Sequence, residues 1–231
     1  YQKQQREPGL MTNLPASLRR DLPSLCGVEL PEPASVLESG DQSTHKFVFR
    51  LPDGALVESV SMRTERRLTF CVSSQIGCAL KCAFCATGLM GLKRNLRPEE
   101  IVAQVLRMGD QHLWLDERFN IVFMGMGEPL ANLGNVLEAI RILHDPRGLN
   151  IGARRITVST SGLVPQIREL ASAGLQLGLA LSLHATTDEL RDLLVPVNRR
   201  WPLEEVLAAA REYGHTVGRR VTLEYTLLGG V

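Results

Sequence analysis

Four of the five cysteines in this 231-residue chain lie between residues 71 and 85. Cys78, Cys82 and Cys85 are separated by three and by two residues, so one short loop carries three thiols that can bind a single metal centre. Only Cys26 lies outside this segment. Cysteines gathered in one place indicate metal binding in a reducing compartment rather than disulfides spread over a secreted fold. The chain must therefore fold so that this loop is presented at a metal site.

The composition is that of an ordinary water-soluble domain, with 44% hydrophobic and 22% charged residues. No apolar run approaches the roughly 20 residues that cross a bilayer, and the first residues are polar, so we expect a cytoplasmic protein. The formal charge of +1 gives no overall attraction for nucleic acid. RNA contacts would depend on local basic groups, and the alternative is that these groups are simply solvated surface residues. The candidates are Arg63/Arg66/Arg67, Lys93/Arg94/Arg97, Arg154/Arg155, Arg199/Arg200 and Arg219/Arg220.

Strand-like and helix-like segments alternate from residue 68 onward, beginning with a buried strand that runs into the cysteine loop. Further strands are expected near residues 120–124, 155–160, 176–183 and 220–228, and helices near 98–108, 133–143, 164–173 and 203–213. This alternation predicts an α/β fold with a parallel sheet, either a barrel or an open doubly wound sheet.

The residues before this alternation predict two smaller parts. Leu14, Leu18 and Leu22 recur at helical spacing, and residues 1–43 are interpreted as the remnant of a helical accessory domain. Residues 44–67 are predicted to form a β-hairpin and linker, with a turn at residues 52–54. Residues 68–231 are assigned to the α/β domain. Because the chain starts at Tyr1 and its last apolar strand would be an exposed edge, we expect it to be truncated at both ends.

A structural zinc site is the first alternative for the cysteine loop, but it needs a fourth ligand, and the next histidine is His112. Three ligands on a [4Fe–4S] cluster would instead leave one iron open to a small molecule. Gly127-Glu128-Pro129 follows the next predicted strand, where loops at the carboxyl ends of barrel strands build active sites. Its glycine lets a ligand approach the backbone, and its carboxylate can accept hydrogen bonds from an ammonium group.

The cysteine run, Phe84 before its third cysteine and Gly127-Glu128-Pro129 together resemble the radical S-adenosylmethionine (SAM) superfamily. Residues 71–85, 91–96, 124–130, 158–162 and 181–185, in this order, are similar to the RlmN/Cfr family of RNA methyltransferases. This resemblance implies a partial (β/α)6 radical SAM barrel, a [4Fe–4S] cluster and SAM as cofactors, and a monomer. It implies 23S rRNA and tRNA as substrates and an electron donor such as flavodoxin.

The resemblance also implies roles for individual residues. Cys78, Cys82 and Cys85 would ligate the cluster, while Gly127 and Glu128 would hold the amino group of SAM. Ser159, Ser182, Leu183 and His184 would line the SAM site. Cys71 would be the resolving cysteine, which releases a covalent RNA intermediate by forming a disulfide. Glu58 would be the general base that removes the proton from adenine C2.

Each of these roles has a structural alternative. Cys71 lies in an apolar strand, where a free cysteine is often a small buried hydrophobe. Glu58 in a hairpin can be a solvated residue, and His184 can be a hydrogen-bonded histidine at a strand end. Ser159 and Ser182 can be polar residues that end strands.

The reaction implied by the resemblance is methylation of adenine C2 through a methylated cysteine. No cysteine follows Cys85 in this chain, so we expect it to bind a cluster but not to complete methyl transfer. Three alternatives remain: a Cfr-type enzyme that methylates adenine C8, a non-catalytic zinc- or cluster-binding RNA module, and a radical SAM activase that acts on protein.

Overall fold

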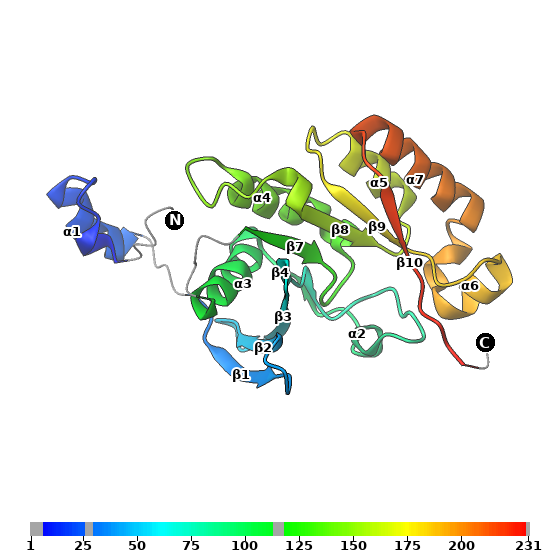
Figure 1. Cartoon of the computed structure of the whole chain (residues 1–231), viewed down its shortest axis with the longest axis horizontal. Coiled ribbons are helices and arrows are strands. Elements are labelled where there is room, and N and C mark those ends of the chain that lie inside the picture. The colour runs from blue at the N-terminus through cyan, green and yellow to red at the C-terminus, as the bar shows by residue number, and fades with distance from the viewer. Residues whose placement is uncertain (1–6, 26–29, 113–117, 230–231) are drawn as a thin grey trace.

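The computed structural model describes residues 7–25, 30–112 and 118–229, which contain a curved eight-stranded sheet with helices packed along it (Figure 1). The strand order in this sheet is β1-β2-β3-β4-β7-β8-β9-β10. A separate pair, β5 and β6, forms a two-stranded sheet. Cys26 lies outside the described residues. No helix in the described ranges has both the length and the apolar character needed to cross a bilayer.

The first half of the sheet is antiparallel: β1 (Pro33–Glu38), β2 (Thr44–Arg50), β3 (Leu56–Thr64) and β4 (Arg67–Cys71) pair in sequence order. The predicted hairpin is confirmed as β2 and β3, and the predicted helix as α1 (Ala16–Leu25), which follows the short helix η1 (Pro8–Leu10). Strand β1 was not predicted and lies inside the segment assigned to a helical remnant. All its residues are exposed, so no alternation of apolar and polar residues marks it in the sequence.

The second half is parallel and contains β4, β7 (Phe119–Phe123), β8 (Ile156–Thr160), β9 (Gly178–Ser182) and β10 (Val221–Glu224). The connections carry α3 (Pro98–Gln111), α4 (Leu133–His144), α5 (Val164–Ala171), α6 (Asp188–Leu194) and α7 (Leu203–Val217). Consecutive strands are neighbours in the sheet, so the chain winds in one direction, as in a barrel. The α/β fold is confirmed. The described residues form an open, barrel-like sheet rather than a doubly wound one.

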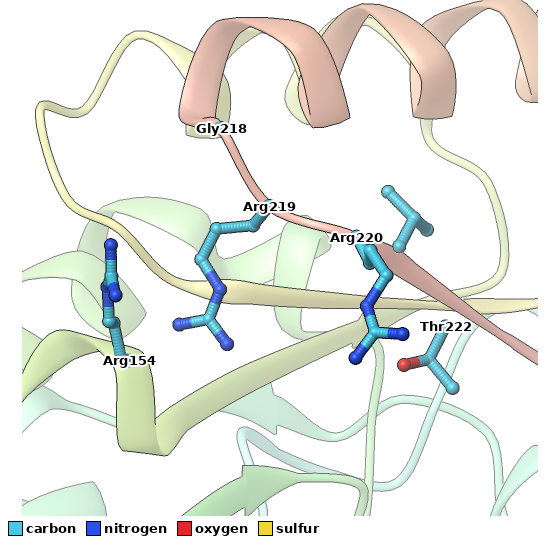
Figure 2. A pocket seen from close by; sticks show the side chains of 6 residues that line it. Arg154, Gly218, Arg219, Arg220 and Thr222 are labelled. Carbon is cyan, nitrogen blue, oxygen red and sulfur yellow. The ribbon is translucent and has the colours of Figure 1, made fainter.

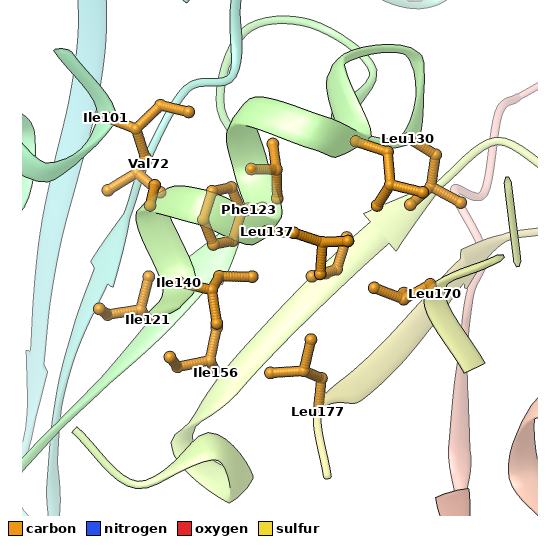
Figure 3. Close-up of a cluster of buried hydrophobic side chains, with 14 of the residues drawn as sticks. Val72, Ile101, Ile121, Phe123, Leu130, Leu137, Ile140, Ile156, Leu170 and Leu177 are labelled. Carbon is orange, nitrogen blue, oxygen red and sulfur yellow. The ribbon is translucent and has the colours of Figure 1, made fainter. Parts of the chain in front are cut away.

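The core lies between the sheet and its helices, where Ile121 and Phe123 of β7 pack with Ile156 of β8 and Ile140 of α4 (Figure 3). All four side chains are essentially inaccessible to solvent. The hydrophobic spacing that predicted the strands therefore comes from burial against helices. Because side chains alternate along a strand, the residues between them point to the opposite, concave face of the sheet.

The strand register places the predicted site residues of the sheet on this concave face. Cys71 is in register with Val122 of β7, and Thr157 of β8 is in register with the same Val122. Two residues beyond Thr157, Ser159 therefore shares their face. Ser182 of β9 and Glu58 of β3 fall on it by the same register argument.

Shorter elements complete the chain between the strands, and the sequence did not predict them. The cysteine loop contains β5 (Gln75–Ile76), α2 (Ala86–Leu89) and β6 (Arg94–Asn95). The remaining turns of 3-10 helix are η2 (Pro129–Asn132), η3 (Ala153–Arg155) and η4 (Pro196–Arg199).

Candidate active site and cofactor cavity

A cavity of about 270 Å³ opens at the carboxyl ends of the parallel strands. Its walls are the cysteine loop, the loop after β7 and the ends of β8, β9 and β10. Eight residues predicted from the sequence line it: Cys78, Cys82, Cys85, Gly127, Glu128, Ser159, Ser182 and His184. The structure therefore brings together residues that are more than 100 positions apart in the chain.

The cysteine loop is closed at its neck by the β5–β6 pair. Ile76 is in register with Arg94, and the Lys93 N–H donates a 2.8 Å hydrogen bond to the Ile76 carbonyl. Gly77 has a left-handed backbone with φ of +78°, and a Cβ there would lie 1.8 Å from the carbonyl oxygen of Gly91. Glycine is thus required at position 77 both for its backbone conformation and for this close approach.

The three thiols sit at different depths in the cavity wall. Cys78 and Cys82 are buried, and burial raises the pKa of the Cys78 thiol and raises that of Cys82 to about 11. The Leu80 N–H points at the Cys78 sulfur at 3.5 Å, and Cys85 is partly exposed. All four described cysteines are free thiols. Because the pKa values of the Cys78 and Cys82 thiols are raised, these two groups hold their protons without a metal, and metal binding must release them.

The donor set fits an iron–sulfur cluster better than a structural zinc ion. Three thiols and no other sulfur or imidazole from the loop face the cavity, which matches a cluster that keeps one iron open for a ligand. Among the described residues, no three or more histidine, cysteine, aspartate or glutamate side chains gather closely enough to hold a single ion. In a cluster each thiolate binds a different iron, so the three thiols need not converge on one ion, and Cys78, Cys82 and Cys85 are the residues that could hold the cluster.

Glu128 is buried beside the thiols and is anchored through its carboxylate. Its Oε1 accepts a 3.1 Å hydrogen bond from the Leu130 N–H, and its Oε2 accepts a 2.9 Å hydrogen bond from the Ser161 N–H. Burial nevertheless raises the pKa of this carboxyl to about 7. The hydroxyl groups of Thr160 and Ser161 also hydrogen-bond to the carboxylate, and an ammonium group in the cavity could be accepted in exchange for these hydroxyls.

Gln75 fixes the loop that carries Glu128. Its Oε1 accepts a 2.8 Å hydrogen bond from the Glu128 N–H, and its amide donates to Asn95 at 2.8 Å. Gly127 has a φ of +95°, and a Cβ there would lie 2.4 Å from the Gln75 side chain. Asn132 extends the network by donating to the carbonyls of Ser74 and Leu96, both at 2.8 Å.

His184 is held in a defined neutral form. Its Nδ1 accepts a 3.1 Å hydrogen bond from the Thr226 N–H, so the ring proton resides on Nε2. Burial and the nearby Arg191 lower the pKa of this imidazole. Its ring meets Phe84 edge to face with centroids 4.6 Å apart. His184 therefore links the cysteine loop to the end of β9.

Arg191 of α6 is fully buried behind the cavity and holds two strand ends together. Its guanidinium donates to the carbonyls of Ser161 at 2.7 Å, Ser182 at 3.1 Å and Leu183 at 3.0 Å, and to Asn198 at 2.8 Å. Burial lowers the pKa of this guanidinium. No sequence pattern predicts this role, because Arg191 belongs to no motif and three of its four acceptors are backbone carbonyls.

Three predicted residues do not line the cavity. Glu58 is on the concave face but forms a 2.8 Å ion pair with Lys46, and its side chain is 45% exposed. Cys71 is buried at the end of β4, and burial raises the pKa of its thiol to about 11. Leu183 contributes its backbone, which bonds to Glu224 and Arg191. The roles of these residues remain predictions.

Several lining residues were not assigned from the sequence: Met124, Thr160, Ser161 and Glu224. Thr160 and Ser161 lie in the 158–162 stretch that carried the family resemblance, so their position was a signal that could have been used. Glu224 ends the last described strand. Its place in the cavity follows from the register of β10 with β9.

A mostly parallel α/β sheet that presents a three-cysteine loop and a glycine-flanked carboxylate at its carboxyl end is the architecture of a radical SAM enzyme. A family model described as the radical SAM superfamily matches residues 72–231. The chain belongs to the radical SAM superfamily, whose cofactors are a [4Fe–4S] cluster and SAM.

Within this superfamily the chain is similar to RNA methyltransferases. It is 53% identical, over its whole length and 62% of the relative, to a probable dual-specificity RNA methyltransferase RlmN of Symbiobacterium thermophilum. It is 48% identical, over its whole length and 66% of the relative, to the dual-specificity RNA methyltransferase RlmN of Geotalea uraniireducens. The chain thus spans about three fifths to two thirds of the length of these curated relatives.

A solved structure supports the same assignment. The crystal structure of a radical SAM methyltransferase from Sphaerobacter thermophilus superposes with a TM-score of 0.94 at 48% identity. The match covers 100% of this chain and 68% of that protein. The predicted family is confirmed.

Proposed function

We propose that the intact protein methylates adenine C2 in 23S rRNA and in tRNA beside the anticodon. The observation that carries this proposal is that Cys78, Cys82 and Cys85 open into one cavity with Glu128 at the carboxyl ends of the strands. The relatives are named as dual-specificity RNA methyltransferases, and this supplies the substrate class. RNA is therefore the proposed partner.

When bound, the cluster and SAM supply a carbon-centred radical, which suits adenine C2 because this electron-poor carbon has no lone pair to attack a methyl sulfonium. Cys78, Cys82 and Cys85 would lose their protons and hold the cluster. Glu128 would accept hydrogen bonds from the amino group of SAM through its carboxylate, and Gly127 would let that group approach the backbone. Ser159, Ser182 and His184 would form the opposite wall.

Cys71 and Glu58 are proposed to act on the RNA base. Both lie on the concave face of the sheet, where Glu58 occupies the position diagonal to Cys71 across β3 and β4. The Glu58–Lys46 ion pair would open when the base arrives, because a general base must be free to accept a proton. Cys71 is a free, protonated thiol, and its partner in a disulfide would be a cysteine beyond the described residues.

The base must leave its stack to reach this cavity, at a cost of a few kcal/mol. Adenines in loops are therefore favoured substrates. We place the protein in the cytoplasm, in agreement with its clustered free thiols, with an electron donor such as flavodoxin.

Mass spectrometry of RNA treated with the full-length, iron-reconstituted enzyme tests the proposal. We expect 2-methyladenosine; methylation at C8 would establish the Cfr-type alternative. If the enzyme still cleaves SAM but forms no methylated RNA, an activase that acts on protein would be favoured. About four irons with broad visible absorbance support the enzyme, whereas one zinc would establish a non-catalytic module.

Two serine variants separate the proposed roles of the cysteines. Cys78→Ser should lose iron and all SAM cleavage. Cys71→Ser should keep iron and SAM cleavage but accumulate a covalent protein–RNA adduct, visible as a slow band on denaturing gels. If Cys71→Ser releases methylated RNA at the wild-type rate, Cys71 is not the resolving cysteine.

A further inference from the structure

A second pocket, of about 650 Å³, lies at the amino ends of β8, β9 and β10, away from the cysteine loop (Figure 2). It is lined by Arg154, Gly218, Arg219, Arg220, Val221 and Thr222. The three arginine side chains reach into the same space from two segments, one before β8 and one before β10 (Figure 2). Arg154 and the Arg219/Arg220 pair, which are far apart in the sequence, thus meet at one place.

Gln176 gathers two of these arginines. Its side-chain oxygen accepts a 3.0 Å hydrogen bond from Arg154 Nε, and its backbone carbonyl accepts a 3.1 Å hydrogen bond from Arg219 Nη1. A guanidinium has five N–H donors, so most donors of both groups remain available. Gly218, with a φ of +68°, ends α7 and turns the chain so that Arg219 and Arg220 follow at once.

In the part of the chain that the structure describes, no carboxylate pairs with these three arginines. Among the described residues, Arg154, Arg219 and Arg220 form no ion pair, whereas Arg147 pairs with Asp145 and Arg168 pairs with Glu212, both at 2.8 Å. No acidic residue lines the pocket either. Like charges held together without a counter-charge favour an anionic ligand, and guanidinium groups bind phosphate through paired hydrogen bonds.

Strand β10 runs from this pocket to the cofactor cavity. Side chains alternate along a strand, so Arg220, Thr222 and Glu224 share one face. Thr222 lines the basic pocket and Glu224 lines the cofactor cavity. At about 3.3 Å per residue, Arg220 and Glu224 are separated by only about 13 Å along the strand. One nucleic acid strand can therefore reach both sites.

We propose that Arg154, Arg219 and Arg220 bind backbone phosphates of the RNA nucleotides that flank the target adenine. This inference rests on the proposed function for the identity of the ligand. RNA is favoured over a small anion because the pocket has a volume of about 650 Å³ and because β10 carries lining residues of both this pocket and the cavity where the base would be modified. These contacts position the substrate and carry no base sequence information.

The test measures binding of a fluorescein-labelled RNA hairpin, with the target adenine in its loop, to the full-length holoenzyme over a series of KCl concentrations. Each phosphate contact to single-stranded RNA contributes about 0.7 to the slope of log affinity against log salt. The variant R154Q/R219Q/R220Q should therefore reduce the slope by about 2 and weaken binding roughly tenfold or more at moderate salt. The matched control R141Q/R147Q/R211Q removes the same charge from the helical side and should change affinity less than about twofold.

A slope equal to that of the wild type, or an equal loss in the control variant, would overturn the proposal. Arginine modification by phenylglyoxal, read by mass spectrometry on the wild-type protein, avoids any folding defect of the variant. The RNA hairpin should protect Arg154, Arg219 and Arg220. Protection by poly-glutamate but not by RNA would instead make the pocket a protein-docking site and overturn the inference. If RNA protects the three arginines but its adenine is not methylated, the phosphate site is supported and the proposed function has failed.

Discussion

Gly77 packs against Gly91 so closely that a Cβ on Gly77 would lie 1.8 Å from the Gly91 carbonyl oxygen. This contact closes the neck of the loop that carries Cys78, Cys82 and Cys85. The position of the three thiols therefore depends on two glycines, which have no reactive side chain.

Replacing Gly77 with alanine should open this neck. The side chain cannot occupy the space without a backbone shift, and the left-handed conformation adds about 1 kcal/mol or more of strain. We expect the G77A protein to fold but to bind much less iron after reconstitution, measured by iron analysis and visible absorbance. Gly134→Ala, in α4 with nothing within 4 Å of its Cβ, is the control and should bind iron like the wild type. Full iron content in G77A would contradict the structure of the loop.

Gly127→Ala should weaken SAM binding while leaving iron content intact. A Cβ at position 127 would displace Gln75, which holds the Glu128 N–H, and so move the carboxylate proposed to accept the SAM amino group. Equilibrium dialysis with SAM on the reconstituted protein should show an affinity roughly tenfold lower, or a loss of about 1.4 kcal/mol. Gly152→Ala, where the added Cβ meets nothing, should retain wild-type affinity. If the two variants bind SAM equally well, Gln75 does not position the site.

The ion pair between Glu100 and Arg94 should make stability depend on pH. Two hydrogen bonds of 2.8 and 2.9 Å join the groups, and despite burial Arg94 and the Arg97 N–H hold the pKa of Glu100 below its usual value. A carboxyl whose pKa is lowered by folding stabilises the protein above its unfolded pKa, and this contribution is lost as the pH falls through the folded pKa. Glu100→Gln should therefore cost on the order of 2 kcal/mol near pH 7 and progressively less below about pH 4.

Urea unfolding at a series of pH values measures this difference. The control is Glu99→Gln, since Glu99 is 62% exposed and its ion pair with Arg97 should contribute less than about 1 kcal/mol at any pH. A Glu100→Gln penalty that does not shrink in acid would show that packing, rather than charge, is responsible.

Arg191→Gln should destabilise the protein by about 3 kcal/mol or more, because buried carbonyls of Ser161, Ser182 and Leu183 would lose their donor. The exposed Arg211 of α7 provides the control, and Arg211→Gln should change the unfolding free energy by less than about 0.5 kcal/mol. Thermal and urea denaturation both report the effect. A small change for Arg191→Gln would mean that water replaces the guanidinium, so the strand ends do not depend on it.

Local signals predicted the fold well where burial is one-sided. Strands β7 and β8 and helix α4 were predicted because the apolar residues within each, including Ile121, Ile156 and Ile140, follow the period of a strand or helix that packs on one core. Strand β1 was missed because it is exposed throughout and is held by backbone hydrogen bonds to β2. Strands β5 and β6 are too short to show a hydrophobic period.

The sequence by itself determined the cofactor chemistry: the spacing of Cys78, Cys82 and Cys85 predicts a three-thiol metal loop wherever the loop is placed. Only the tertiary structure decided which residues share its cavity. Glu128 and Ser161 meet because β7 and β8 are neighbours in a parallel sheet, and Arg154 meets Arg219 because the segment before β9 places Gln176 between them. These contacts join residues distant in sequence, and strand order and register, which local patterns do not encode, bring them together.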